Sequence, residues 1–108
     1  MLKYQVSHKL LFGIAVCFLM AYTIATLNVN GLRNPQKREI VFEYLLRRKV
    51  AIVFLQETHS EVGDESTWRR QWGGQIAFSH GTTNSCGVAI LISQKSGLHL
   101  INFKNDSN

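Results

Sequence analysis

The feature that most constrains this chain is an uninterrupted apolar run of six residues, Val50–Leu55. A short run of this kind, rich in β-branched residues, is typical of a strand that is buried on both faces of a sheet. A helix start precedes it at Asn34–Pro35, where Asn34 can cap the helix and Pro35 suits its first position. The run therefore predicts a central strand that follows directly on a helix.

The segments on either side of this strand predict alternating strands and helices. Residues 23–27 alternate polar and apolar side chains and predict a strand, so that strand, helix and strand form a βαβ unit with parallel strands. The expected helix carries an apolar stripe, and its basic end at residues 47–49 is expected to be solvated. The stripe consists of Ile40, Val41, Tyr44 and Leu45.

The second half of the chain predicts a short helix and more strands. Residues 66–70 suggest the helix, residues 75–80 and 87–93 a hairpin, and residues 98–103 a further strand. Trp68 and Trp72 flank two arginines, which suits either base stacking or the buried side of the helix. A chain of 108 residues has room for one α/β domain.

The N-terminus is unusually apolar. Lys3 and Lys9 precede an uncharged stretch from Leu10 to Tyr22, which has the form of a signal peptide or a membrane anchor. A cleavage site within residues 23–25 would, however, remove most of the first predicted strand. We therefore expect residues 1–22 to be an uncleaved hydrophobic extension of a domain at 23–108, with residues 10–22 able to contact a membrane.

Charge and cysteine content restrict the partners. A formal net charge of +5 suits a polyanion such as nucleic acid, or an anionic membrane. The two cysteines, Cys17 and Cys86, have no metal-ligand spacing in the sequence. Two free thiols are expected, with a disulfide between them as the alternative, and no zinc site is predicted.

Two polar clusters follow the two predicted parallel strands: residues 28–31 and residues 56–59. The carboxyl ends of parallel strands lie at one edge of a sheet, so the clusters should meet there. Glu57 could then hold Mg²⁺ together with water and a substrate phosphate, with Asn28 beside it. The alternatives are a capping role for Glu57 or its ion pair with Arg33, a simple turn at 28–31, and a solvated His59.

Three blocks of sequence, in this order, resemble a known superfamily. Residues 27–33 (LNVNGLR), 54–59 (FLQETH) and 86–92 (CGVAILI) are similar to the opening of the endonuclease/exonuclease/phosphatase superfamily, which includes DNase I and the apurinic endonucleases. The sequences of these motifs are most similar to the endonuclease domain of LINE-type retrotransposons. The resemblance spans residues 23–93.

The resemblance implies a fold, a reaction and roles for two residues. The fold would be the N-terminal half of a DNase I-like four-layer α/β sandwich, incomplete and with the inner face of one sheet exposed. The reaction would be Mg²⁺-dependent hydrolysis of DNA phosphodiesters, in the nucleus, with Glu57 as metal ligand and Asn28 as catalytic residue. Asn30 stands where apurinic endonucleases often carry a second acid.

The later motifs of the superfamily have no counterpart in this sequence. They supply a Tyr, an Asp-x-Asn pair and a terminal Asp-His pair, whereas only eleven residues follow Gly97. We therefore expect this chain to be a fragment of a DNA endonuclease of retrotransposon origin that is inactive alone. The alternative is a non-enzymatic membrane-anchored or secreted small protein that acts through its hydrophobic N-terminus.

Overall fold

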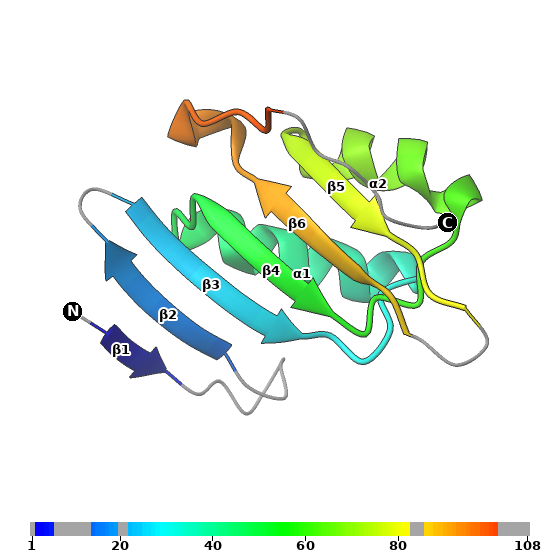
Figure 1. Cartoon of the computed structure of the whole chain (residues 1–108), viewed down its shortest axis with the longest axis horizontal. Coiled ribbons are helices and arrows are strands. Elements are labelled where there is room, and N and C mark those ends of the chain that lie inside the picture. The colour runs from blue at the N-terminus through cyan, green and yellow to red at the C-terminus, as the bar shows by residue number, and fades with distance from the viewer. Residues whose placement is uncertain (1, 6–13, 20–21, 83–85, 102–108) are drawn as a thin grey trace.

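A six-stranded sheet forms the centre of the protein in a computed structural model (Figure 1). The structure describes the backbone of residues 2–5, 14–19, 22–82 and 86–101, and the side chains of 22–82 and 86–101. The strand order is β1-β2-β3-β4-β6-β5. The strands are β1 (Leu2–Gln5), β2 (Ile14–Leu19), β3 (Tyr22–Asn28), β4 (Ile52–Gln56), β5 (Gln75–Ser79) and β6 (Val88–Ile92).

The predicted βαβ unit is confirmed. Strands β3 and β4 are parallel and in register from Ile24↔Ile52 to Asn28↔Gln56, and helix α1 (Pro35–Arg47) connects them. Strands β5 and β6 form the predicted antiparallel pair, and β6 also pairs antiparallel with β4. The carboxyl ends of β3 and β4 therefore lie side by side at one edge of the sheet.

Helix α1 begins as predicted, and its buried stripe contains Val41 and Leu45 of the predicted stripe but not Ile40. The Asn34 side chain accepts a hydrogen bond from the Lys37 amide at 2.9 Å, and Pro35 is the first helical residue. Ile40, expected in the core, is 48% exposed. The buried residues instead follow the spacing i, i+3, i+4, i+7, which places one stripe of a 3.6-residue helix against the sheet. They are Arg38, Val41, Phe42 and Leu45.

Helix α2 (Glu65–Trp72) is longer than the predicted segment 66–70 and resolves the role of the tryptophans. Trp68 and Trp72 are 1% and 3% exposed, and the Trp72 indole donates to the Ile92 carbonyl at 2.9 Å. Trp68 packs near the Phe78 ring, and the Arg38 guanidinium lies 5.4 Å from the Trp68 ring centre. The indoles are therefore core residues and are not available for base stacking.

Among the described residues, no helix lies on one face of the sheet. Both helices lie on the same side of the sheet, as Figure 1 shows. Val53 and Leu55 point to that side and are 0% and 1% exposed, whereas Phe54 on the opposite side is 41% exposed. The prediction that residues 50–55 are buried on both faces is therefore wrong for this chain.

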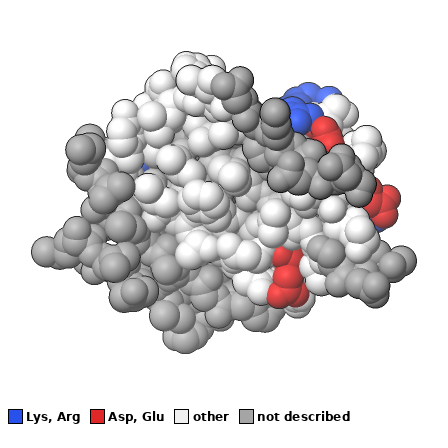
Figure 2. All heavy atoms as spheres, viewed as in Figure 1, with Lys and Arg blue, Asp and Glu red and all other residues white. Residues whose placement is uncertain are grey.

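The helix-free face is largely apolar over β3, β4 and β6, whose side chains are described. Phe54 pairs with Thr26 and Ile90 on the neighbouring strands, and Val88 beside Gln56 is 48% exposed. In the view of Figure 2 the described surface over the sheet is mostly uncharged, and the charged side chains lie toward its rim. We call this surface, formed by Ile24, Thr26, Ile52, Phe54, Val88 and Ile90, the open face. Its exposure agrees with the expectation of an incomplete sandwich.

One of the two strands predicted near the ends of the described chain is present and the other is absent. Residues 98–101 form no strand, so the prediction of a strand at 98–103 is wrong there, and residues 102–103 lie outside the described part. The predicted strand at 23–27 is confirmed within β3, and β2 pairs antiparallel with it from Ile14↔Leu27 to Leu19↔Tyr22. Among the described residues, no helix is long and apolar enough to cross a bilayer. The division between an extension at 1–22 and a domain at 23–108 stays a prediction.

Candidate functional site

The sheet edge at the ends of β3 and β4 brings together the two polar side chains singled out from the sequence. Asn28 is the last residue of β3, and Glu57 follows the last residue of β4. The Asn28 amide Nδ2 donates a short hydrogen bond to Glu57 Oε2. Both side chains are half-buried, so the carboxylate is held in a defined orientation and still reaches solvent.

The loops that follow β3 and β4 continue the pairing of the two strands. The amides of Val29, Gly31 and Leu32 donate to the carbonyls of Gln56, Glu57 and Thr58 at 3.0, 2.6 and 3.0 Å. Asn28 Oδ1 accepts from the Asn30 amide at 3.0 Å, which closes a turn on the same side chain. Asn30 and Gly31 have φ of 48° and 87°, a conformation that Asn and Gly tolerate best.

Glu57 does not pair with Arg33, so the alternative of an ion pair between them is wrong. Arg33 instead lies 3.1 Å from an Asp64 carboxylate oxygen and 3.6 Å from one of Glu61. Within the described part of the chain Glu57 makes no ion pair, and its polar partner is the neutral amide of Asn28. A negative charge held by a neutral donor keeps its capacity to attract a cation.

The donor chemistry of this pair fits Mg²⁺. The ion prefers oxygen ligands, and it is commonly bound through one or two carboxylates while waters and a substrate phosphate complete its shell. Glu57 supplies one such carboxylate. Asn30, at the position of the superfamily's frequent second acid, supplies an exposed amide and no charge.

Two further side chains reach the same edge, one of which the sequence did not indicate. His59 is exposed as expected, but it lies close to Glu57 and Cys86. The ligand atoms of these three residues all lie within 4.8 Å of one another. A backbone hydrogen bond holds Cys86 at this edge, because its carbonyl accepts from the His59 amide at 2.7 Å. The spacing of the cysteines did not indicate this cluster, because Cys86 lies 27 positions from His59 along the chain.

A chain of hydrogen bonds lies beneath the loop that follows β4. The hydroxyls of Thr58 and Ser60 are 3.0 Å apart, Ser60 Oγ lies 2.8 Å from His80 Nδ1, and His80 Nε2 lies 2.5 Å from Glu65 Oε2. Because a carboxylate only accepts, His80 Nε2 carries the proton of that bond. The hydrogen bond from His80, followed by Arg69, lowers the pKa of Glu65 despite partial burial. Thr58 and Ser60 are 0% and 3% exposed, so these hydrogen bonds hold the loop to the interior of the protein.

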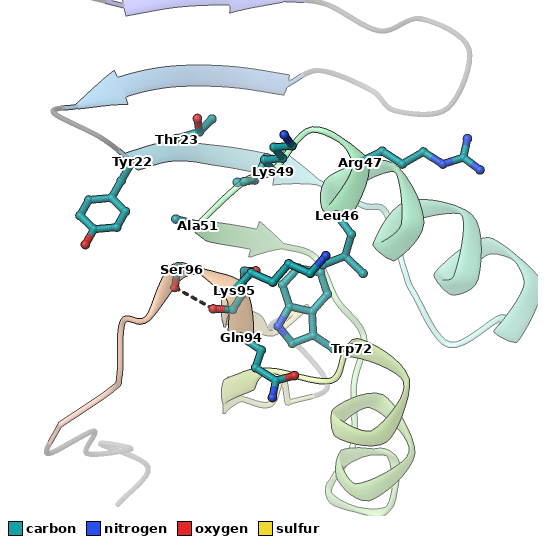
Figure 3. A pocket seen from close by; sticks show the side chains of 12 residues that line it. Tyr22, Thr23, Leu46, Arg47, Lys49, Ala51, Trp72, Gln94, Lys95 and Ser96 are labelled. Atoms are coloured by element: carbon teal, nitrogen blue, oxygen red, sulfur yellow. Dashed lines mark hydrogen bonds between the residues drawn. The ribbon is translucent and has the colours of Figure 1, made fainter.

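A pocket of about 590 Å³ lies at the opposite edge of the sheet (Figure 3). Tyr22, Ala51, Trp72 and Lys95 are among the residues that line it. Tyr22 begins β3 and Ala51 precedes β4, whereas Asn28 and Glu57 are at the other ends of these strands. The pocket is therefore separate from the Asn28–Glu57 site.

Comparison with known proteins identifies the class of protein to which this fold and site belong. The family model described as the endonuclease/exonuclease/phosphatase family matches residues 25–95, which include both parallel strands, Asn28, Glu57 and β6. The chain belongs to this family. Its six-stranded sheet with two helices on one face is a mixed α/β arrangement consistent with a partial DNase I-like domain.

A relative in Xenopus laevis, the transposon TX1 uncharacterized 149 kDa protein, is 43% identical over 74 residues. The match covers 68% of this chain and 6% of the relative, so the chain spans a small part of that protein's length. The family and this relative are consistent with a nuclease-like function. They give no support to a membrane-anchored or secreted protein acting through its N-terminus.

Proposed function

We propose that this chain carries the metal-binding half of a Mg²⁺-dependent DNA endonuclease of LINE-type retrotransposon origin. The observation that carries the proposal is the pairing of Asn28 with Glu57 at the carboxyl ends of two parallel strands. Ligands of open α/β sheets bind at such an edge. A nuclear location goes with the proposal, because the substrate is DNA.

Each of the two residues has a separate task in this proposal. Glu57 holds the ion, and Asn28 holds Glu57 by donating to Oε2, so the carboxylate does not have to be ordered when the ion binds. When bound, Mg²⁺ supplies a Lewis acid that stabilises the charge developing on the phosphodiester. The net charge of +5 favours the approach of DNA to the protein.

We further propose that these 108 residues do not hydrolyse DNA by themselves. No counterpart of the superfamily's terminal Asp-His pair, its general base and the residue that orients it, is found in the sequence. The open face supports the same conclusion, since exposed apolar side chains such as Phe54 and Val88 are those that a second sheet would cover.

The test measures retention of a duplex DNA with and without Mg²⁺, and nicking of a supercoiled plasmid. We expect Mg²⁺ to increase DNA retention by the native chain but not by Glu57→Gln, and both proteins to nick at the same background rate. Glu43→Gln, which removes an exposed acid on α1, is the matched control and should behave like the native chain.

Two results would overturn the proposal. An equal effect of Mg²⁺ on the native chain and on Glu57→Gln would remove Glu57 as the metal ligand. Nicking by the native chain that disappears in Glu57→Gln would show that the chain is catalytically complete.

A further inference from the structure

Glu57, His59 and Cys86 together form a donor set of a different kind from a magnesium site. Glu57 and His59 come from the loop after β4, and Cys86 precedes β6, yet their ligand atoms lie within 4.8 Å of one another. Zinc lies about 2.0–2.3 Å from each of its ligand atoms. A shift of about one or two ångströms would bring the three ligand atoms to this distance from one common ion. The cluster is partly exposed, so an ion can reach it from solvent.

The backbone brings these residues together, so the cluster does not depend on chance side-chain conformations. The amides of Thr58 and His59 donate to the carbonyls of Gly87 and Cys86 at 3.2 and 2.7 Å. These bonds extend the contact between the two segments past the ends of β4 and β6, with the antiparallel register shifted by one residue. The segment that carries Cys86 is thereby fixed beside the loop that carries His59.

The loop presents its side chains alternately to the cluster and to the protein interior. Glu57 and His59 have φ of 56° and 55°, in the left-handed region. The side chains of Thr58 and Ser60, which alternate with them, are buried. The buried hydroxyls join the hydrogen-bond chain to His80. The Cβ that Gly31 lacks would lie 3.2 Å from His59 Cδ2, so the imidazole packs against the glycine.

The chemistry of the three ligands selects the ion. Mg²⁺ prefers oxygen, whereas imidazole and thiolate suit borderline ions such as Zn²⁺ and Co²⁺. Three protein ligands also leave the fourth tetrahedral position to water or another ligand. We propose that Glu57, His59 and Cys86 bind one Zn²⁺-class ion.

This inference goes beyond the proposed function and has a consequence for it. Glu57 is common to both sites, so one carboxylate cannot serve Mg²⁺ and Zn²⁺ fully at the same time. Zn²⁺ would therefore act as a competitor that withdraws Glu57 from the Mg²⁺ site. Binding of Zn²⁺ itself does not require DNA, Mg²⁺ or catalysis.

The experiment is a titration of the full chain with Co²⁺ alone, followed by displacement with Zn²⁺. We expect one Co²⁺ per chain, visible tetrahedral d–d bands and a thiolate-to-metal charge-transfer band in the near ultraviolet, all lost when Zn²⁺ is added. Cys86→Ser should abolish the charge-transfer band, and Glu57→Gln and His59→Asn should each weaken Co²⁺ binding at least tenfold. Asn suits position 59 because it tolerates the left-handed backbone.

The other cysteine provides the matched control. Cys17→Ser, in β2, should keep the charge-transfer band and the affinity of the native chain. A band that survives Cys86→Ser, or one that is lost in Cys17→Ser, would overturn the proposal. Far-ultraviolet circular dichroism of each variant distinguishes a lost ligand from a lost fold. Failure here leaves the Mg²⁺-dependent DNA retention unaffected, so the two proposals fail separately.

Discussion

The side-chain amide of Asn28 donates to the carboxylate of Glu57, although the two residues are 29 positions apart. The bond forms because β3 and β4 are parallel and in register up to Asn28↔Gln56, which leaves Glu57 one residue beyond the pairing. A turn at one strand end and an acid at the other thereby become a single polar unit.

This bond should be measurable as a coupling between the two residues. In a double-mutant cycle of Asn28→Ala and Glu57→Ala, we expect a coupling of about 1 kcal/mol in the free energy of unfolding, as for a partly exposed hydrogen bond to a charge. Urea denaturation of the four proteins gives the value. The pair Asn28→Ala and Glu43→Ala is the control and should be additive, and additivity in the test cycle would contradict the structure.

The hydrogen bond between His80 and Glu65 predicts a stability that depends on acidic pH. The pKa of Glu65 is lowered from its ordinary value of 4.5, so ionised Glu65 favours the folded state above that pH. This contribution is lost as the pH falls from 4.5 through the lowered value. Glu65→Gln should cost about 1–2 kcal/mol at neutral pH and flatten the acid limb.

Urea denaturation at a series of pH values tests this expectation. Glu43→Gln, which removes an exposed partner of Arg47, should leave the acid limb as in the native chain. Parallel pH profiles of the native chain and Glu65→Gln would show that the carboxyl titrates alike in the folded and unfolded states.

Gly87 should tolerate no side chain. Its φ is +81°, and a Cβ there would lie 2.8 Å from Thr58 Oγ1 and 2.9 Å from the Gly81 amide nitrogen. Gly87→Ala should therefore cost at least about 2 kcal/mol, because backbone strain and a clash add. Gly97 has a similar φ of +75° with nothing within 4 Å, so Gly97→Ala isolates the backbone cost at about 1 kcal/mol. Equal thermal midpoints for the two variants would refute the close contact with Thr58.

The open face predicts self-association of the chain. Phe54→Lys places a charge at the middle of this face and should shift sedimentation toward the monomer and reduce the binding of a hydrophobic dye. Ile40→Lys changes a residue of similar exposure, 48% against 41%, on the outer side of α1. Ile40→Lys should leave both measurements unchanged, and an equal shift in the two variants would show that the face has no special role.

The sequence predicts the parts of the structure that follow from local pattern and from strand direction. The Asn34 cap, the parallel pairing of β3 with β4 and the meeting of Asn28 with Glu57 all belong to this group. Strand ends are a property of one segment, and parallel direction follows from a single helical connection. Strand ends and parallel direction can therefore be predicted without knowing which segments pack together.

The features that escape prediction depend on contacts between segments. The position of Cys86 beside His59 requires β6 to lie next to β4, which no local pattern specifies. Phe42 replaces Ile40 in the core because the rotation of α1 is set by the sheet it covers. The exposure of Phe54 depends on whether anything covers the second face, and a run of apolar residues carries no such information.

Side chains that face solvent and side chains that are buried alternate along the loop at 57–60, so the candidate ligands are separate from the residues that hold the loop in place. The side chains at positions 57 and 59 reach solvent, and those at 58 and 60 hold the loop to His80. The ligand set can therefore be exchanged while the support below it stays constant. A library at 57, 59 and 86, restricted at 57 and 59 to residues that tolerate the left-handed backbone, should contain mostly folded members. A library randomised at 58, 60 and 80 should not. In evolutionary terms, such a loop can lose one activity and acquire another without passing through an unfolded ancestor.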